Sequence, residues 1–188
     1  MRISDTTTDE ELIQKVREED RELYGEVIRR YQTKLRHYLR KFFRDPDELE
    51  DALQEIFIRA YRNLYDFNIN RRFAPWIYRV AHNEAINQIK KKSSRYAISL
   101  EEHEIDVLDK SLSVGEQMDA GKVSQQLGEA LSQLKDKYRE PLILHYFEDR
   151  SYEEIADIMR LPVGTVGTLL SRGKQRLKEI IKKSYDNQ

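Results

Sequence analysis

The sequence predicts an all-α protein in which two small helical domains are joined by a flexible acidic linker, the C-terminal domain being a helix-turn-helix. Apolar residues recur three and four positions apart along most of the 188 residues, and strand-like alternation is absent. This periodicity fades between residues 93 and 122, a Ser-rich stretch with three basic and seven acidic residues. Such a composition is typical of a linker, so we predict domains at 1–92 and 123–188 with a linker at 93–122.

The N-terminal domain is predicted to be a bundle of about four helices. A helix at 21–43 is indicated by a run of apolar residues at Leu23, Val27, Tyr31, Leu35, Leu39 and Phe42. Asp45 and Pro46 end this helix and begin the next, at 46–65, because Pro is tolerated in a first turn. The buried stripe of that helix is expected to be Leu49, Leu53, Ile56, Ala60 and Leu64. A further helix is predicted at 74–92, with a core stripe of Ile77, Ala81, Ala85 and Ile89.

The C-terminal domain contains the sharpest local pattern. Periodicity resumes at Val123, Leu127, Leu131 and Leu134, and further helices are predicted at 136–147, 151–160 and 164–183. Ser151 and Glu154 form a capping box, in which each side chain bonds the backbone amide of the other residue. Residues 161–164 make a tight turn, after which Thr165 opens a longer helix. This helix-turn-helix arrangement lets its second helix enter a major groove of DNA.

Charge is arranged in blocks, although the net charge is only −1. Residues 29–44 carry seven basic and no acidic side chains, and residues 45–57 carry six acidic and no basic ones. Residues 71–92 and 172–183 each carry six basic side chains against a single acid. Blocks of like charge indicate that different surfaces bind different partners, although any one block could equally be a solvated helix face.

Several classes of protein are excluded. The chain has no Cys, which rules out disulfides, thiolate metal sites and iron–sulfur clusters. The first thirty residues lack the apolar segment of a secretory signal, and the longest apolar stretch, at 142–147, is too short to span a bilayer. No catalytic motif is present, and the acidic run with His103 at 101–104 is expected to be solvated rather than a metal site. We therefore expect a cytoplasmic protein with no enzyme activity, metal or cofactor.

Two surfaces of the N-terminal domain are candidates for binding partners. Helix 46–65 turns an acidic and polar face away from its core, which suits a protein partner, at Asp51, Gln54, Glu55, Ile58 and Arg62. Aromatic, amide and basic side chains, the types that hold unstacked bases and their phosphates, gather at Phe67, Arg71, Arg72, Phe73, Trp76, Arg79, Asn83, Asn87 and Lys90. The alternative stays open that Phe73 and Trp76 are core aromatics and that the acidic face is ordinary surface.

The second helix of the helix-turn-helix has the pattern of a recognition helix. Its apolar face is expected to be Val166, Leu170, Leu177, Ile180 and Ile181. The opposite face and its flanks carry Thr165, Thr168, Ser171, Arg172, Lys174, Gln175, Arg176 and Lys178. Polar side chains read base edges and cations bind phosphates, so this face suits duplex DNA. The alternative is an ordinary surface helix of a bundle.

These motifs together resemble the extracytoplasmic-function (ECF) sigma factors, the compact promoter-recognition subunits of bacterial RNA polymerase. The resemblance is carried, in the family's order and spacing, by LEDALQEIFIRAY at 49–61, FAPWIYRVAHN at 73–83, LKDKYRE at 134–140, YEEIA at 152–156 and PVGTV at 162–166. Each motif alone is moderately specific, whereas the ordered set spans both domains and is very specific.

The resemblance implies a role for each surface. Asp51, Gln54 and Glu55 would dock on the β′ clamp helices of core polymerase, whose β subunit is a further expected contact. The segment 67–83 would read and hold the melted −10 strand, with Asn83 meeting a flipped base. The second helix of the helix-turn-helix would read the −35 duplex, and the acidic linker would thread toward the active centre. An anti-sigma factor is a candidate further partner, and no membrane insertion is implied.

The chain departs from the family pattern in its recognition helix. Relatives usually carry a basic residue where this chain has Gly167, and often Arg where it has Leu169, which leaves the −35 sequence preference open. One alternative function also remains, a two-domain regulator that binds duplex DNA without replacing the polymerase specificity subunit. It accounts for residues 123–188 but not for the two surfaces of the N-terminal domain.

Overall fold

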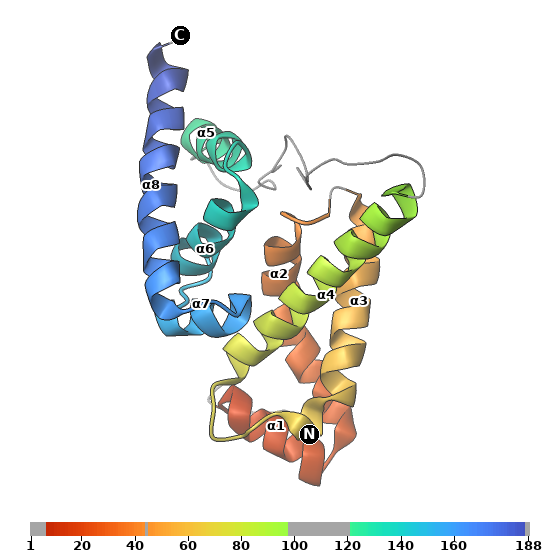
Figure 1. The fold of residues 1–188 in the computed structure, drawn as a ribbon. Helices are drawn as coiled ribbons and strands as arrows, with labels where there is room; N and C mark the ends of the chain where they lie inside the picture. The colour runs from red at the N-terminus through yellow and green to blue at the C-terminus, as the bar shows by residue number, and fades with distance from the viewer. Residues whose placement is uncertain (1–6, 44, 98–120, 187–188) are drawn as a thin grey trace. The chain divides into compact units, whose positions relative to one another are not determined.

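All regular secondary structure in the described part of the chain is helical (Figure 1). The computed structural model describes residues 7–43, 45–97 and 121–186. The chain divides into two units, Met1–Tyr96 (unit 1) and Ala97–Gln188 (unit 2), in agreement with the predicted all-α class and its two helical domains. Helices extend into both ends of the predicted linker, to Ala97 and from Gly121, and the rest of that linker lies outside the described residues.

Unit 1 begins with two helices joined by a short 3₁₀ turn. They are α1 (Asp9–Glu18), η1 (Arg21–Leu23) and α2 (Tyr24–Leu39). The predicted single helix at 21–43 is therefore too long at both ends. The Asp20 side chain accepts a bond from the Glu22 amide at 2.8 Å and starts the 3₁₀ turn, while the amides of Phe42 and Phe43 fold back onto the Leu39 carbonyl.

Our sequence prediction did not locate α1, although its start carries a clear signal. Thr8 and Glu11 form a capping box, with backbone-to-side-chain bonds of 2.9 and 3.2 Å. Leu12, Ile13 and Val16 on one side of the helix are buried. An acid-rich sequence with only three core residues gives a weak periodic signal, so the capping box would have been the better guide.

The rest of unit 1 consists of α3 (Pro46–Arg62), η2 (Leu64–Asp66) and α4 (Phe73–Ala97). Asp45 caps α3 by accepting from the Asp47 amide at 2.9 Å, and Pro46 occupies the first helical position, as predicted. Every residue of the predicted α3 stripe is buried, and so are Ile77, Ala81 and Ala85 of the predicted α4 stripe. In Figure 1, α2, α3 and α4 lie side by side, and α1 packs near one end of them.

Unit 2 consists of α5 (Gly121–Ser132), α6 (Asp136–Tyr146), α7 (Tyr152–Met159) and α8 (Val163–Asp186). The long α8 packs against the other three helices. The predicted capping box is confirmed, with bonds of 3.0 and 3.2 Å between Ser151 and Glu154. The turn lies earlier than predicted, because Arg160 adopts a left-handed conformation (φ 54°) and α8 already begins at Val163.

Two glycines of α8 have different surroundings. A Cβ on Gly173 would lie 3.1 Å from Leu142 Cδ1 and 3.2 Å from the Tyr138 carbonyl oxygen, so α8 approaches α6 too closely there for a side chain. A Cβ on Gly167 would lie 3.7 Å from the Tyr152 ring, an ordinary contact. Gly173 is therefore required for packing, whereas Gly167 is not.

We expect opposite effects on stability at these positions. Gly173→Val should destabilise unit 2 by about 1–3 kcal/mol through overpacking. Gly167→Ala should stabilise α8 by about 0.5–1 kcal/mol, because Gly is a poor helix former. Urea unfolding of the two variants beside the unsubstituted chain measures both effects. Equal stability of the two variants would contradict this account of the α6–α8 contact.

Candidate promoter and polymerase interface

The acidic face of α3, which we call the docking face, consists of Asp51, Gln54, Glu55 and Ile58. Asp51 and Gln54 are exposed, and Ile58 is 44% exposed, which is unusual for a large apolar side chain. The neighbouring Glu50 is bonded by Arg36 of α2 at 2.6 and 3.0 Å, which lowers the pKa of that carboxyl. These residues leave an open surface of acids, an amide and one aliphatic side chain.

Glu55 differs from the rest of the docking face because it has a partner within unit 1. Arg59 Nε lies 2.9 Å from a Glu55 oxygen and also 2.9 Å from an oxygen of Glu84 on α4. Glu84 is only 2% exposed, and a buried carboxylate requires a partner of opposite charge. One guanidinium therefore joins the docking face to the helix behind it.

The start of α4 carries an aromatic cluster and a basic rim. The Phe67, Phe73 and Trp76 rings have centroids 5.3–5.5 Å apart. Phe67 is 3% and Phe73 0% exposed, so the expectation that these two rings contact bases directly is corrected: they fill the core beneath Trp76, which is half-buried. Burial removes these apolar rings from water, so the buried position is more stable for them than an exposed one.

The polar candidates around this cluster remain accessible. Arg71, Arg72, Asn87 and Lys90 are exposed, whereas Arg79 and Asn83 are half-buried. Cations thus lie at both ends of a surface that has Trp76 and Asn83 between them. This arrangement can attract phosphates at its ends and place an aromatic ring and an amide against bases.

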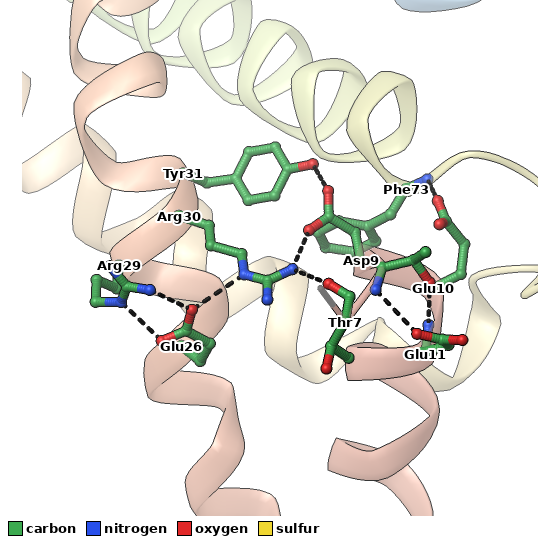
Figure 2. A network of polar contacts seen from close by, with 10 residues as sticks. Thr7, Asp9, Glu10, Glu11, Glu26, Arg29, Arg30, Tyr31 and Phe73 are labelled. Atoms are coloured by element: carbon green, nitrogen blue, oxygen red, sulfur yellow. Dashed lines mark hydrogen bonds and ion pairs between the residues drawn. The ribbon is translucent and has the colours of Figure 1, made fainter. Parts of the chain in front are cut away.

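Helix α1 contributes contacts to the same end of unit 1. Figure 2 shows Glu10 reaching the backbone amide of Phe73, with a bond of 2.8 Å. Beside it, Asp9 accepts bonds from Arg30 at 2.9 Å and from the Tyr31 hydroxyl, and the Tyr31 ring meets that of Phe73 edge-on at 5.5 Å. Arg17 donates to the carbonyls of Leu64 and Phe67. Sequence reasoning missed Glu10 and Arg17, because their partners lie about fifty or more residues away.

The expected recognition face of α8 is exposed throughout, at Thr165, Thr168, Ser171, Arg172, Lys174, Gln175, Arg176 and Lys178. Val166 and Leu170 opposite are buried, while Leu177, Ile180 and Ile181 are half-buried. The Thr168 hydroxyl donates to the Gly164 carbonyl at 3.0 Å. The flanking cations lie over rings of α6, Lys174 at 5.7 Å from Tyr146 and Arg176 at 4.8 Å from Tyr138.

Other kinds of site are not seen in the described ranges. Residues 7–43, 45–97 and 121–186 hold no cluster of three His, Cys, Asp or Glu side chains that could bind a metal ion. The acidic run at 101–104 lies outside these ranges. No described helix is both long enough and apolar enough to cross a bilayer.

Comparison with known proteins gives a family for both units. Residues 27–95 match sigma-70 region 2, and residues 124–177 match sigma-70 region 4. The ECF RNA polymerase sigma factor SigW of Bacillus subtilis (strain 168) is 33% identical over 174 residues, which span 89% of this chain and 93% of the relative. The chain belongs to the ECF sigma factor family.

Further comparisons agree with this assignment. The ECF sigma-E factor of Escherichia coli (strain K12) is 31% identical over 182 residues, covering 93% of this sigma factor and 95% of the relative. The sigma factor RpoE of Bartonella quintana, solved with the anti-sigma factor NepR, shares the fold with a TM-score of 0.71 at 23% identity, covering 85% of this chain and 96% of that one.

The family settles the function at a coarse level. This sigma factor binds core RNA polymerase and promoter DNA and directs promoter-specific transcription initiation. The alternative of a regulator that leaves the specificity subunit in place is not favoured, because the region 2 match covers the surfaces that it left unexplained.

Proposed function

We propose a residue-level division of labour in which the docking face binds core polymerase, the start of α4 binds the melted −10 strand, and α8 reads the −35 duplex. The observation that carries this proposal is the separation of charge within unit 1. The exposed docking face on α3 is acidic, whereas the exposed rim of α4 is basic. An acidic surface repels DNA and suits a protein partner, while a basic one attracts phosphates.

The proposed strand-binding surface lies on α4 and the two residues before it, and consists of Arg71, Arg72, Trp76, Arg79, Asn83, Asn87 and Lys90. Asn83 is half-buried, so a base placed against its amide would be partly shielded from water. A carboxamide offers both donors and an acceptor to the edge of an unpaired base. Phe67 and Phe73 act beneath this surface by supporting Trp76 rather than by touching the strand.

On α8, the proposal gives Arg172 the leading part in reading bases. Lys174 and Arg176 lie on the flanks over Tyr146 and Tyr138, positions suited to phosphate contacts. Arg172 is exposed on the outer face, and a guanidinium can bond both acceptors of a guanine in the major groove. Gly167 and Leu169 offer no polar side chain. Thr168 and Gln175 are therefore the other side chains proposed to contact base edges, with a smaller contribution than Arg172.

We further propose that this sigma factor performs no chemistry of its own and works in the cytoplasm, where the polymerase supplies catalysis. An anti-sigma factor is proposed as a further partner, since the Bartonella quintana RpoE of the same fold was solved with one. The proposed path of residues 98–120 toward the polymerase active centre falls outside the described residues.

The docking face is tested by reversing one charge. Asp51→Lys should weaken binding to core polymerase by about 2–5 kcal/mol, the usual cost of breaking a desolvated charged contact. Asp51 is preferable to Glu55, whose replacement by Lys would also place a cation against Arg59. Affinity is measured by fluorescence anisotropy with labelled sigma factor. Glu19→Lys, a charge reversal at the exposed residue that follows α1, serves as control, and equal affinities would refute the docking face.

The strand-binding surface is tested at Asn83. Asn83→Ala should leave closed-complex binding near normal but reduce open-complex formation about tenfold, because an extruded base would lose its bonding partner. Permanganate reactivity of thymines near the start site reports the opened strand. The control is Gln133→Ala, which removes an exposed amide in unit 2. Unchanged reactivity in the Asn83 variant would remove Asn83 from the proposal.

The recognition helix is tested by selection on randomised −35 duplexes. Arg172→Ala should cost roughly 1–3 kcal/mol and relax the preference at one base pair. Lys178→Ala should weaken binding to every −35 sequence to the same extent. It should also reduce the slope of log affinity against log salt concentration by about one. If the motif selected by the Arg172 variant equals that of the unsubstituted protein, Arg172 contacts phosphate and the reading face lies elsewhere.

A further inference from the structure

We propose that Glu10 and Arg17 of α1 are positioning residues that hold the α3–α4 connection, residues 63–72, and the start of α4 in the conformation that binds the melted strand. The inference rests on the proposed function of the α4 surface and adds to it a mechanism of preorganisation. It concerns a helix that lies before the stretch matched by sigma-70 region 2, which begins at residue 27.

The first observation is that the residue before α4 cannot cap the helix with its side chain. The residue before its first turn is Arg72, which has no short side-chain acceptor, and the first turn contains no acidic residue. Two basic residues, Arg71 and Arg72, instead place positive charge beside the positive end of the helix dipole. An acceptor supplied by another segment would therefore stabilise this helix start.

Glu10 supplies the missing group from α1. Its carboxylate accepts the Phe73 amide at 2.8 Å across 63 positions of sequence (Figure 2). A carboxylate at a helix N-terminus satisfies a free amide and offsets the dipole, and such charge-assisted bonds are stronger than neutral ones. The start of α4 thereby depends on the presence of α1.

Arg17 holds the other end of the connection. Its Nη2 donates to the carbonyls of Leu64 and Phe67, and its guanidinium lies 5.8 Å from the ring centroids of both Tyr65 and Phe67. The Tyr65 hydroxyl returns a bond to the Arg17 carbonyl at 3.1 Å. These contacts hold the first half of the connection, from Leu64 to Phe67.

Both contacts converge on the aromatic cluster below the strand-binding surface. Arg17 fixes the backbone of Phe67 and Glu10 fixes that of Phe73, and these two rings flank Trp76. If either contact is lost, the connection samples more conformations and a smaller fraction is ready to bind. Apparent affinity for the strand falls in proportion to that fraction, so a tenfold drop in the competent fraction gives about a tenfold loss.

The experiment uses the whole 188-residue chain and the Glu10→Ala and Arg17→Met variants, of which the first removes the acceptor of the Phe73 amide and the second the guanidinium. Their matched controls are Glu19→Ala and Arg21→Met, which make the same changes at exposed positions. Trp76 is the single Trp of the chain, so acrylamide quenching of its fluorescence reports on the cluster directly. Three further quantities are measured for each variant. They are the affinity of the reconstituted holoenzyme for a single-stranded −10 oligonucleotide, the affinity of the sigma factor for core polymerase, and its thermal unfolding midpoint.

We expect both variants to make Trp76 more accessible to quencher and to weaken oligonucleotide binding about tenfold, with core polymerase affinity unchanged. Quenching and oligonucleotide affinity equal to those of the controls would overturn the inference, as would a loss of polymerase affinity equal to the loss for the oligonucleotide. Arg17→Lys, which keeps the charge but lacks the planar fork, should fall between Arg17→Met and the unsubstituted protein, and it provides the test if Arg17→Met does not fold.

Asn83→Ala in the same oligonucleotide assay separates this inference from the function on which it rests. If Asn83→Ala weakens binding and the α1 variants do not, the positioning role is wrong and the strand-binding surface stands. If none of the three weakens binding, the strand-binding surface itself is wrong.

Discussion

The geometry of the end of unit 1 where α4 begins depends on the burial of Phe73. Its ring is fully buried and meets the rings of Tyr31, Phe67 and Trp76 at 5.3–5.5 Å. A buried aromatic side chain of this kind contributes about 3–5 kcal/mol, a large share of the stability of a small domain. Because Phe73 is the first residue of α4, anchoring its ring fixes where the helix begins and hence where Asn83 faces.

Local sequence patterns predicted most of the fold. The α3 stripe, the Asp45 cap and the Ser151 capping box depend on residues close together in the chain, and all were found where expected. The orientation of Phe67 and Phe73 was not predictable in this way. An aromatic residue within a basic segment is equally compatible with a base-binding surface and with a core, and only packing against Tyr31 of another helix decides between them.

Contacts between distant segments account for the other misses. Nothing in the sequence around Phe73 indicates that its amide is bonded by Glu10, and nothing around Gly173 indicates how closely α6 approaches. Periodicity identifies the buried face of a helix, whereas it carries no information on which helix covers that face or how near it comes. The α7–α8 turn lies within about two residues of its predicted place, and the small shift occurs where Arg160 takes a left-handed conformation that usually belongs to Gly or Asn.

The two surfaces of unit 1 are physically connected, even though their charges are opposite. Glu84 of α4 is buried and would be costly to leave without a cation, so Arg59 of α3 is held beside it. The same guanidinium then fixes the Glu55 carboxylate within the docking face. The position of α4 therefore sets the orientation of an acid on α3, just as α1 sets the start of α4. The net charge of −1 does not reveal this arrangement. The acidic and basic blocks cancel in the sum, but the fold places them on different helices.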